Sequence, residues 1–581
     1  MTSCFTLKIR LRNASSSTAL VDITVDGGLQ GWGVSISVDI LECPVGFAQD
    51  KASGKCHCEQ ILANNNVQCN MSVIPFTFLR SGNSWFGYIN NTQCITGTSN
   101  CPFDYCNRSI VSFDIMAPDS QCVANRTGIL CGQCQSQLSI MLGSNHCGTC
   151  SNWYLFMLPV IALAGIVLVA VLMFLNLSVS VGTINGLLFY ANIVKLNEAF
   201  FFPNGGVPVV SQFISWLNLD LGIEVCLFDG LDGYWNTWLQ FAFPAYLFLL
   251  MGGIIIGCRY SVWLCRLCGS HAVPALATLF LMSYVKILLT VTRALSMSQL
   301  PCNDSILTVW SVDGNIAYRS GKHLPLVIFS CGVLVIGLAY PVLVLCAPLL
   351  ERYSHKCIPL HSWNPVAKLK PLFDAYGGPY KDKYRFWTGV TLMVRLIATV
   401  AFSFTSGGLI IINAFIIIVI VVAILTFWSF TKGVYKSIYL STLEVVHLFN
   451  IFILSTVSLA LEFLLLNQNL VTIISVSLSF GVFLVTIAIH FKWNFNLMKM
   501  RRKLGFKDPR PKYIQVAQTS SDEDEDSPPP GSPPSMVYGS CRGEHQFVLE
   551  FPHRPRDNGE ELELLDTSPV LLEREPLLFD F

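Results

Sequence analysis

Residues 408–428 read GLIIINAFIIIVIVVAILTFW and contain no charged side chain. A helix needs about 20 mainly apolar residues to cross the hydrocarbon core of a bilayer, so this stretch predicts a membrane-spanning helix. The composition of the 581-residue chain agrees, because 52% of its residues are hydrophobic and only 13% are charged. Soluble domains carry about 25% charged residues. We therefore expect a polytopic membrane protein.

Eight further stretches of similar length and polarity predict a mainly α membrane protein with about nine transmembrane helices. The predicted spans are 153–175, 180–201, 234–257, 272–295, 324–347, 386–404, 408–428, 443–464 and 470–490. The second span is the weakest, because it contains Lys195, Asn197 and Glu198. An odd number of spans places the two ends of the chain on opposite sides of the membrane.

Cysteines and glycosylation sequons indicate which side the N-terminal region occupies. Closely spaced cysteines are typical of an oxidised, disulfide-stapled module, here of the EGF-like Cys-rich kind. They are Cys43, Cys56, Cys58, Cys69, Cys94, Cys101, Cys106, Cys122, Cys131, Cys134, Cys147 and Cys150. Asn-x-Ser/Thr sequons predict a glycoprotein with these residues outside the cell; they are Asn13, Asn70, Asn90, Asn107, Asn125 and Asn303.

Two alternatives concern the same cysteines. Cys131-x-x-Cys134 followed by Cys147-x-x-Cys150 has the spacing of a zinc ribbon, although the surrounding sequons favour disulfides. Two further cysteines, Cys226 and Cys302, lie in predicted outer loops, and we expect a disulfide between them.

The distribution of Lys and Arg supports an N-out, C-in orientation, since cytoplasmic loops carry an excess of these residues. The predicted inner loop 351–385 is basic, whereas the predicted outer loop 202–233 contains no Lys or Arg. That outer loop holds four acids, Asp220, Glu224, Asp229 and Asp232. They predict either a mouth that gathers cations or simply a solvated acidic loop.

These patterns divide the chain into four regions. Residues 1–42 alternate apolar and polar side chains, as at the end of an extracellular β-domain. Residues 43–150 form the Cys-rich module, 151–493 the membrane domain, and 494–581 a disordered cytoplasmic tail. Residues 1–20 lack the apolar region of a signal peptide, so either the first span acts as a reverse anchor or the chain is a fragment of a longer protein. The unmatched Cys4 and the abrupt strand pattern favour a fragment.

Ionisable residues inside predicted spans form the first candidate site, because charges in a membrane are costly and usually paired or functional. A polar pathway or ligand site would consist of Lys195, Glu198, Lys286 and Arg395. The alternative is structural: interhelical ion pairs, including one between Lys195 and Glu198, and snorkelling of Arg293, Glu444 and Glu462 towards the interface.

The second candidate is the elbow, residues 374–387, between the fifth and sixth spans. Its candidate coupling residues are Asp374, Tyr376, Gly377, Gly378, Pro379, Tyr380, Lys381, Lys383, Tyr384, Arg385 and Trp387. We expect the glycines to break the chain and Pro379 to begin a new helix. Tyr380, Tyr384 and Trp387 would then share one face as an interface anchor, and the Lys and Arg side chains would meet anionic headgroups. We expect the elbow to act as a lever on the sixth span.

Further motifs lie on the predicted cytoplasmic side. Cys258, Cys265 and Cys268 are juxtamembrane candidates for palmitoylation, with a metal site that includes His271 as the alternative. The tail contains one tyrosine-based and two acidic dileucine sorting motifs, which predict binding to clathrin adaptors. Their key residues are Tyr513, Val516, Glu560, Leu564, Leu565, Glu573, Leu577 and Leu578.

Two stretches carry a resemblance: WLNLDLGIEVCLFDGLDGYWNTWLQFAFPAY (216–246) and DAYGGPYKDKYRFWTGVTLMVRL (374–396). They resemble the C-terminal membrane domain of large Cys-rich surface proteins of sponges, other early-branching animals and protists. That domain is distantly similar to the transient receptor potential-like membrane region of fungal proteins. The resemblance covers roughly residues 40–505 and implies a surface protein whose ectodomain extends upstream. Channel activity would follow by analogy of fold alone.

Three functions remain open from the sequence. The first is a plasma-membrane receptor or adhesion-type protein that has an unknown extracellular ligand and cycles through endosomes. The second is a transient receptor potential-like channel or transporter, and the third is a structural cell-recognition protein. The expected partners are membrane lipids and clathrin adaptors. No motif predicts an enzyme, a cofactor, a metal site or nucleic-acid binding.

Overall fold

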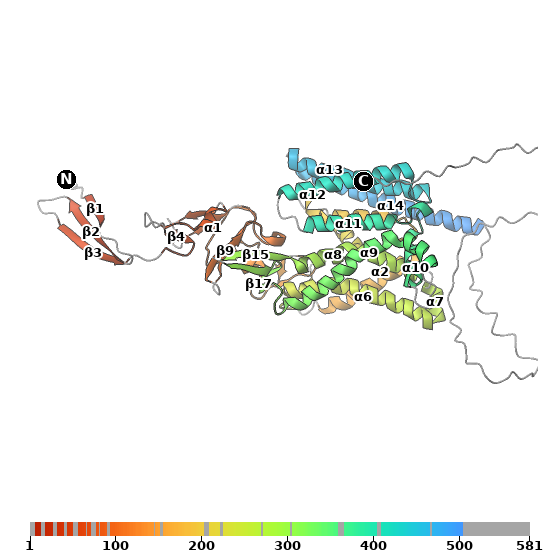
Figure 1. Ribbon diagram of the computed structural model, residues 1–581, viewed down its shortest axis with the longest axis horizontal. Coiled ribbons are helices and arrows are strands. Elements are labelled where there is room, and N and C mark those ends of the chain that lie inside the picture. The colour runs from red at the N-terminus through yellow and green to blue at the C-terminus, as the bar shows by residue number, and fades with distance from the viewer. Residues whose placement is uncertain are drawn as a thin grey trace, which may run out of the picture. The chain divides into compact units, whose positions relative to one another are not determined.

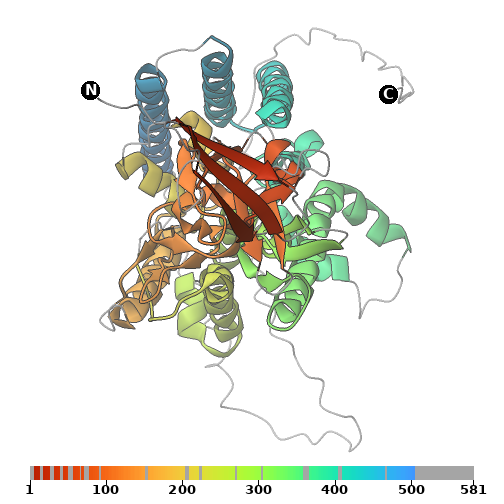
Figure 2. The same ribbon diagram turned by 90° about the vertical axis from the view of Figure 1, so that its left-hand side faces the viewer.

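A computed structural model describes residues 6–503 of the chain, apart from short segments. Those segments are 13–17, 27–31, 40–42, 50–55, 66, 71–76, 81, 90–92, 145, 151–154, 203–207, 221–224, 269–270, 303–304, 358–364, 404–407 and 465–467. The fold is mainly helical, with small β-sheets in the N-terminal region (Figures 1 and 2).

The first 42 residues contain the antiparallel strands that their alternating pattern predicts. Strands β1 (Thr6–Arg12), β2 (Thr18–Asp26) and β3 (Trp32–Asp39) form a meander in which β2 is central. In the register of this sheet, Ile23 of β2 pairs with Ile9 on one side and Val34 on the other.

The Cys-rich module, residues 43–150, consists of short strands and turns around two small apolar cores. Its strands are β4 (Phe47–Gln49), β5 (Cys56–Cys58), β6 (Gln68–Asn70), β7 (Thr77–Arg80), β8 (Trp85–Ile89), β9 (Cys94–Thr98), β10 (Val111–Phe113), β11 (Arg126–Thr127), β12 (Gln133–Cys134), β13 (Ser139–Ile140) and β14 (Cys147–Gly148). Its helical turns are α1 (Gln60–Ala63), η1 (Pro102–Asp104), η2 (Pro118–Gln121) and η3 (Ile129–Cys131). The strands pair as β10-β7-β6, β4-β5, β8-β9, β11-β12 and β13-β14.

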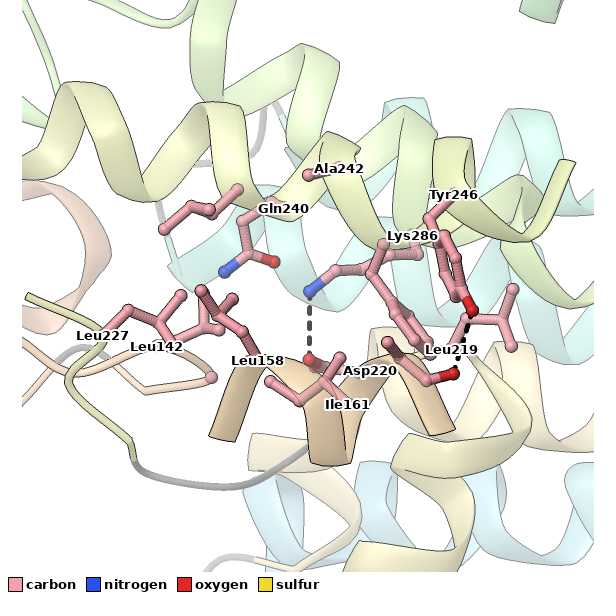
Figure 3. A pocket seen from close by; sticks show the side chains of 14 residues that line it. Leu142, Leu158, Ile161, Leu219, Asp220, Leu227, Gln240, Ala242, Tyr246 and Lys286 are labelled. Atoms are coloured by element: carbon pink, nitrogen blue, oxygen red, sulfur yellow. Dashed lines mark hydrogen bonds and ion pairs between the residues drawn. The ribbon is translucent and has the colours of Figure 1, made fainter. Parts of the chain in front are cut away.

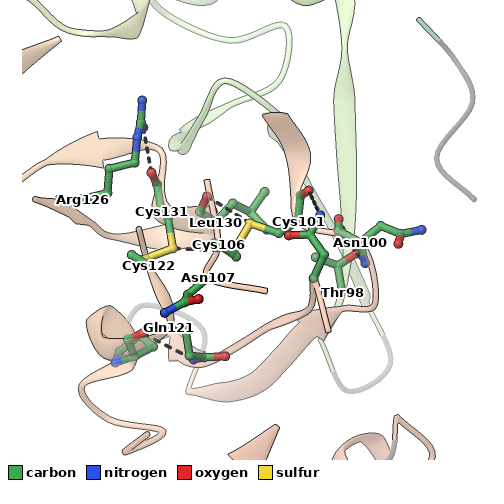
Figure 4. The surroundings of a disulfide bond; sticks show 12 residues. Thr98, Asn100, Cys101, Cys106, Asn107, Gln121, Cys122, Arg126, Leu130 and Cys131 are labelled. Atoms are coloured by element: carbon green, nitrogen blue, oxygen red, sulfur yellow. Dashed lines mark hydrogen bonds between the residues drawn. A yellow bond between two sulfur atoms is a disulfide. The ribbon is translucent and has the colours of Figure 1, made fainter. Parts of the chain in front are cut away.

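Disulfides hold the module together, as its cysteine spacing predicts. The pairs within it are Cys43–Cys56, Cys58–Cys69, Cys101–Cys106, Cys122–Cys131 and Cys134–Cys147. Figure 4 shows the Cys122–Cys131 bridge, where the guanidinium of Arg126 donates to the carbonyl of Cys131 at 2.9 Å. The zinc-ribbon alternative is wrong, because its four cysteines belong to three different disulfides.

The expected disulfide between Cys226 and Cys302 is also wrong. Cys94 of β9 bonds to Cys302, and Cys150 bonds to Cys226. The reason is that β9 packs against strand β15 (Met297–Cys302), which brings Cys94 rather than Cys226 next to Cys302. Each outer loop is therefore joined to the module and not to the other loop.

The loop after the fourth span folds into a three-stranded sheet that we call the outer sheet. It contains β15, β16 (Ser305–Trp310) and β17 (Asp313–Ala317) in that order. Leu300 and Val309 of the outer sheet share an apolar core with Trp85 and Leu130 of the module. The module is thus packed on the membrane domain as well as disulfide-bonded to it.

Eight helices in the described part of the chain are long and apolar enough to cross a membrane. They are α2 (Met157–Phe174), α6 (Gly233–Tyr260), α8 (Ala272–Leu295), α9 (His323–Cys357), α11 (Trp387–Ser403), α12 (Gly408–Lys432), α13 (Ile438–Leu464) and α14 (Gln468–Lys503). Each matches a predicted span. We call the end that carries the module outer, following the predicted orientation.

The second predicted span, 180–201, differs from the other eight. It contains α3 (Asn185–Leu196) and α4 (Glu198–Phe201), and it is followed by a third short helix, α5 (Pro208–Leu217). Helix α3 is about 18 Å long, shorter than the bilayer core of about 30 Å. Residues 185–194 are all buried, because α8, α11 and α13 pack around α3. Protein rather than lipid surrounds this helix, so it can be short and polar.

Two short helices at the inner end complete the fold. Helix α7 (Val262–Cys268) follows α6, and α10 (Pro365–Gly377) precedes the elbow. A single 3₁₀ turn, η5 (Asp382–Tyr384), leads into α11.

Candidate functional site

Helices α3 and α5 lie antiparallel and bring an acidic residue into the bundle. The amide of Asn192 donates to the amide oxygen of Asn218 at 2.6 Å, and the ammonium of Lys195 donates to Ser215 at 2.9 Å. The chain runs along α3 towards the outer end and then returns along α5. Helix α5 therefore re-enters the membrane domain from the outer end. Asp220 follows directly after this return.

Four charged side chains form a partly buried cluster at the end of α5. Lys195 pairs with Glu198 at 2.7 Å and lies 3.8 Å from Asp220, whose carboxylate also accepts from Lys286 of α8 at 3.1 Å. Ser211 of α5 donates to Glu198. The side chains of Asp220 and Lys286 are only 16% and 13% exposed. The ion pair expected between Lys195 and Glu198 therefore belongs to a larger network.

Asp220 is the candidate site residue whose position differs most from the expectation. It was expected to face solvent with three other acids of the outer loop, but it lies inside the membrane domain. Asp229 instead accepts a hydrogen bond from Ser139, and Asp232 caps α6 by accepting from the amide of Trp235 at 2.9 Å. Glu224 is outside the described residues. The three described acids have separate local roles, so they do not form a single cation-gathering mouth among themselves.

Arg395 does not join the cluster, which corrects the expectation of one four-residue site. It lies on α11, is 1% exposed, and has its guanidinium carbon 5.4 Å from the centre of the Phe189 ring. Its Nε and Nη1 atoms have no hydrogen-bond partner among the residues that the structure describes. Arg395 therefore marks a second buried polar region.

A cavity of about 210 Å³ adjoins the charged cluster (Figure 3). Helices α2, α6 and α8 form its walls, and Leu142 of the module and Leu227 of the outer loop also line it. Figure 3 shows the Lys286–Asp220 pair and the amide of Gln240 within this otherwise apolar lining. Leu142 is held in place by a β-bridge to Val225, next to the Cys150–Cys226 disulfide.

Helix α8 also contacts the elbow on the inner side. The hydroxyl of Tyr376 donates to the carbonyl of Ala277 in α8 at 2.9 Å and bonds to the hydroxyl of Tyr340 in α9. Thr388 of α11 donates to the carbonyl of Tyr376 at 3.2 Å. Tyr376 therefore connects three membrane helices.

The elbow differs from the predicted lipid-facing helix. Helix α10 extends through Gly377, Tyr380 forms a β-bridge with Tyr435, and α11 begins only at Trp387, so Pro379 does not start a helix. Tyr380, Tyr384 and Trp387 are at most 9% exposed and pack in the core. The predicted interface anchor is wrong, because these aromatic side chains fill space between helices. Burial also raises the pKa of Tyr380 to about 12.

The charged residues of the elbow divide into two groups. Arg385 pairs with Glu351 of α9 at 3.3 Å and with Asp374 of α10 at 2.6 Å, so it holds the elbow to its neighbours instead of facing headgroups. Lys381 and Lys383 are exposed, as a contact with anionic headgroups requires.

The remaining candidates are exposed to different extents. Cys258, Cys265 and Cys268 form no disulfide, and Cys268 is buried, which does not suit an acylation site. Asn107 and Asn125 are exposed, as glycan acceptors must be. Asn13, Asn90, Asn303 and the sorting motifs of the tail lie outside the described residues, and the side chain of Asn70 is likewise not described.

Comparisons with known proteins assign no relative to this chain: no family model, no curated protein and no solved structure matches it.

Proposed function

We propose that the chain is a multi-pass cell-surface receptor in which the Cys-rich module acts on the cytoplasmic side through helix α8. The supporting observation is that α8 contacts the outer sheet, which is disulfide-bonded to the module, at one end and the elbow at the other. At its outer end, Trp310 of the outer sheet donates to the carbonyl of Arg293 at 3.0 Å, and Tyr318 donates to that of Leu295 at 3.0 Å. At its inner end, α8 accepts the hydrogen bond from Tyr376.

The disulfides make this connection mechanical. Cys302 ends strand β15, which follows α8 after one residue, and its bond to Cys94 transmits any displacement of the module to that strand. The charged cluster contacts α8 between the two ends, because Lys286 lies nine residues, or about 14 Å, beyond Ala277. A ligand that moves the module or the cluster would therefore act on a rigid element that reaches the elbow.

The tail motifs extend the proposal. Sorting signals recognised by clathrin adaptors would return the receptor from the plasma membrane to endosomes. Lys381 and Lys383 would keep the elbow near anionic lipid headgroups, at about 1 kcal/mol each.

The test reduces the Cys94–Cys302 and Cys150–Cys226 disulfides and measures the response of the elbow. A circularly permuted fluorescent protein inserted within residues 358–364 would report on the elbow in intact cells. A membrane-impermeant reductant should change its fluorescence, whereas a variant with Cys94, Cys302, Cys150 and Cys226 all replaced by Ser should not respond. Unchanged fluorescence in the parent chain, with the disulfides shown to be reduced by mass spectrometry, would refute the proposal.

A second candidate function is a channel or transporter, favoured by a row of polar contacts along α3 and its neighbours. The hydrogen-bonded pairs are Tyr190–Ser479 at 2.7 Å, His447–Thr486 at 2.9 Å, Asn185–Tyr380 at 3.2 Å and Thr183–His490 at 2.8 Å. Gly186 permits close approach here, since a Cβ at that position would lie 2.5 Å from a carboxylate oxygen of Glu444. This row continues inward from the charged cluster.

Whole-cell recording distinguishes the two functions. A receptor of the proposed kind gives no ionic current when the reporter responds. A current that disappears in Arg395→Ala or Glu198→Ala at unchanged surface abundance would instead favour conduction.

A further inference from the structure

The geometry points to a lipid-binding site: we propose that the cavity between α2, α6 and α8 binds a single-chain amphiphile with an anionic headgroup. This inference deepens the proposed receptor function and rests on it for its physiological meaning. The binding itself can be tested separately.

The walls of the cavity select the apolar part of the ligand. Leu158 and Ile161 of α2 and Phe243 of α6 are among its lining residues, and Leu158 is 47% exposed at the rim. Val160 and Leu163, on the same helix, are 56% and 60% exposed apolar residues that face lipid in a membrane. At about 210 Å³ the cavity is smaller than the 300–1,000 Å³ typical of drug-sized ligands. It therefore suits a headgroup and the first part of a chain whose remainder extends along α2 into the outer leaflet.

The polar groups of the cavity select the headgroup. The Lys286 ammonium has three N–H donors, and Asp220 is its only hydrogen-bond partner among the described residues. Two donors thus remain for a ligand, next to the side-chain amide of Gln240 (Figure 3). Carboxylate and phosphate oxygens accept such charge-assisted hydrogen bonds most strongly.

The two lysines of the cluster balance its two carboxylates, because Lys195 pairs with Glu198 and Lys286 pairs with Asp220. Arg293, on the same helix as Lys286, adds a positive charge at the exposed outer end of α8. An anionic headgroup would therefore depend on its direct hydrogen bonds with Lys286 and Gln240.

The position of the site explains how binding would be sensed. The headgroup would contact Lys286 on α8, while Leu142 and Leu227 lie on segments fixed by the Cys134–Cys147 and Cys150–Cys226 disulfides. An occupied cavity would then hold the module, the outer loop and α8 in one arrangement.

The experiment measures binding to the purified full chain in nanodiscs of zwitterionic lipid. The probe is a long-chain fatty acid with a diazirine in its chain, and the competitors are the unlabelled fatty acid, a lysophosphatidic acid and a fatty alcohol, all of equal length. We expect saturable photolabelling of α2 or α6 peptides, and at least tenfold weaker competition by the alcohol. Whichever acid competes better identifies the headgroup as a carboxylate or a phosphate.

Three variants make the test specific. Lys286→Gln should weaken binding about 10- to 100-fold, the range expected for the loss of a hydrogen bond to a charged group. Ile161→Trp should abolish labelling by filling the cavity without a change in charge. Lys322→Gln, at an exposed lysine of the outer surface, is the matched control and should bind normally.

Equal competition by acid and alcohol, or labelling that persists in both cavity variants, would overturn the proposed site. If the fatty-acid probe binds but reduction of the disulfides does not change the fluorescence of the elbow reporter, the site is confirmed and the receptor function is refuted. If the probe does not bind but reduction still changes the fluorescence, the site alone is refuted.

Discussion

Replacement of Asp220 by Asn should destabilise the membrane domain through the charge that it leaves behind. The substitution preserves the shape of the side chain but removes the carboxylate that accepts from Lys286 at 3.1 Å. Removing one partner of a buried ion pair costs about 3–5 kcal/mol, and both side chains are less than one-fifth exposed. Lys195 retains Glu198 and Ser215 as partners, so most of the loss arises at Lys286. We expect the free energy of unfolding to fall by about 3 kcal/mol.

A double-mutant cycle isolates the interaction. Lys286→Met should cost about 2 kcal/mol, less than Asp220→Asn, because Asp220 keeps Lys195 at 3.8 Å. The double variant should be more stable than the sum of the two losses implies, by about 2 kcal/mol, within the range observed for contacting residues.

The assay is equilibrium unfolding of the purified chain in mixed micelles at increasing dodecyl sulfate, followed by tryptophan fluorescence. Lys322→Met, at the exposed outer lysine, serves as the control and should change stability by less than about 0.5 kcal/mol. Two outcomes would refute a stabilising interaction between Asp220 and Lys286. One is a double variant whose loss of unfolding free energy equals the sum of the two single losses within about 0.3 kcal/mol; the other is an Asp220→Asn variant of unchanged stability.

Three further predictions concern the outer sheet, the glycans and the tail. Burial raises the pKa of Asp313, so the folded chain binds a proton at this carboxyl more readily than the unfolded chain does. The contribution of Asp313 to stability should therefore rise as the pH falls through the folded pKa. Melting temperatures measured between pH 7 and pH 4 should show this gain in the parent chain but not in Asp313→Asn, and identical pH profiles of the two chains would contradict it. Glycosidase treatment should lower the mass of the expressed chain, and Asn107→Gln with Asn125→Gln should reduce that shift; no shift at all would contradict the N-out orientation. Replacing Leu564, Leu565, Leu577 and Leu578 by Ala should raise surface abundance and slow uptake, as measured with an antibody to the module, and unchanged uptake would exclude the sorting role.

The long helices could be predicted from sequence because lipid surrounds them. Helix α12, for example, presents apolar residues on nearly all sides, so hydropathy alone identifies it. Helices α3 and α5 could not be predicted in the same way. Protein surrounds α3, and the polar side chains of α5 are hydrogen-bonded to those of α3. Asn192 donates to Asn218 there, and Lys195 donates to Ser215, which removes the requirement for apolar composition.

The disulfide pairing and the charged cluster were beyond sequence reasoning for a related reason. Both depend on contacts between segments far apart in the chain, as between Cys94 and Cys302 or between Asp220 and Lys286. The acidic outer loop offered one signal for Asp220. This residue lies twelve positions after Pro208, the first residue of α5, and directly follows Leu219, which adopts a φ of 53°. The sequence does not reveal that α5 returns into the bundle, so the pattern alone predicts that Asp220 is exposed to solvent.

The buried aromatic residues of the elbow illustrate the same difficulty. Tyr380, Tyr384 and Trp387 have the composition of an interface anchor, yet contacts with α12, α13 and the 433–437 turn bury them. The Tyr380–Tyr435 bridge and the pairing of Arg385 with Glu351 are the features that fix this arrangement. Each involves a partner that spacing along the chain does not reveal.

Hydrogen–deuterium exchange can follow transmission from the module to the elbow along the chain. The purified chain in nanodiscs would be compared before and after reduction of the Cys94–Cys302 and Cys150–Cys226 disulfides. If α8 connects the module to the elbow, reduction should give faster exchange both in the outer sheet and in the elbow at residues 374–387. Faster exchange confined to the outer sheet and the module, with an unchanged elbow, would contradict it.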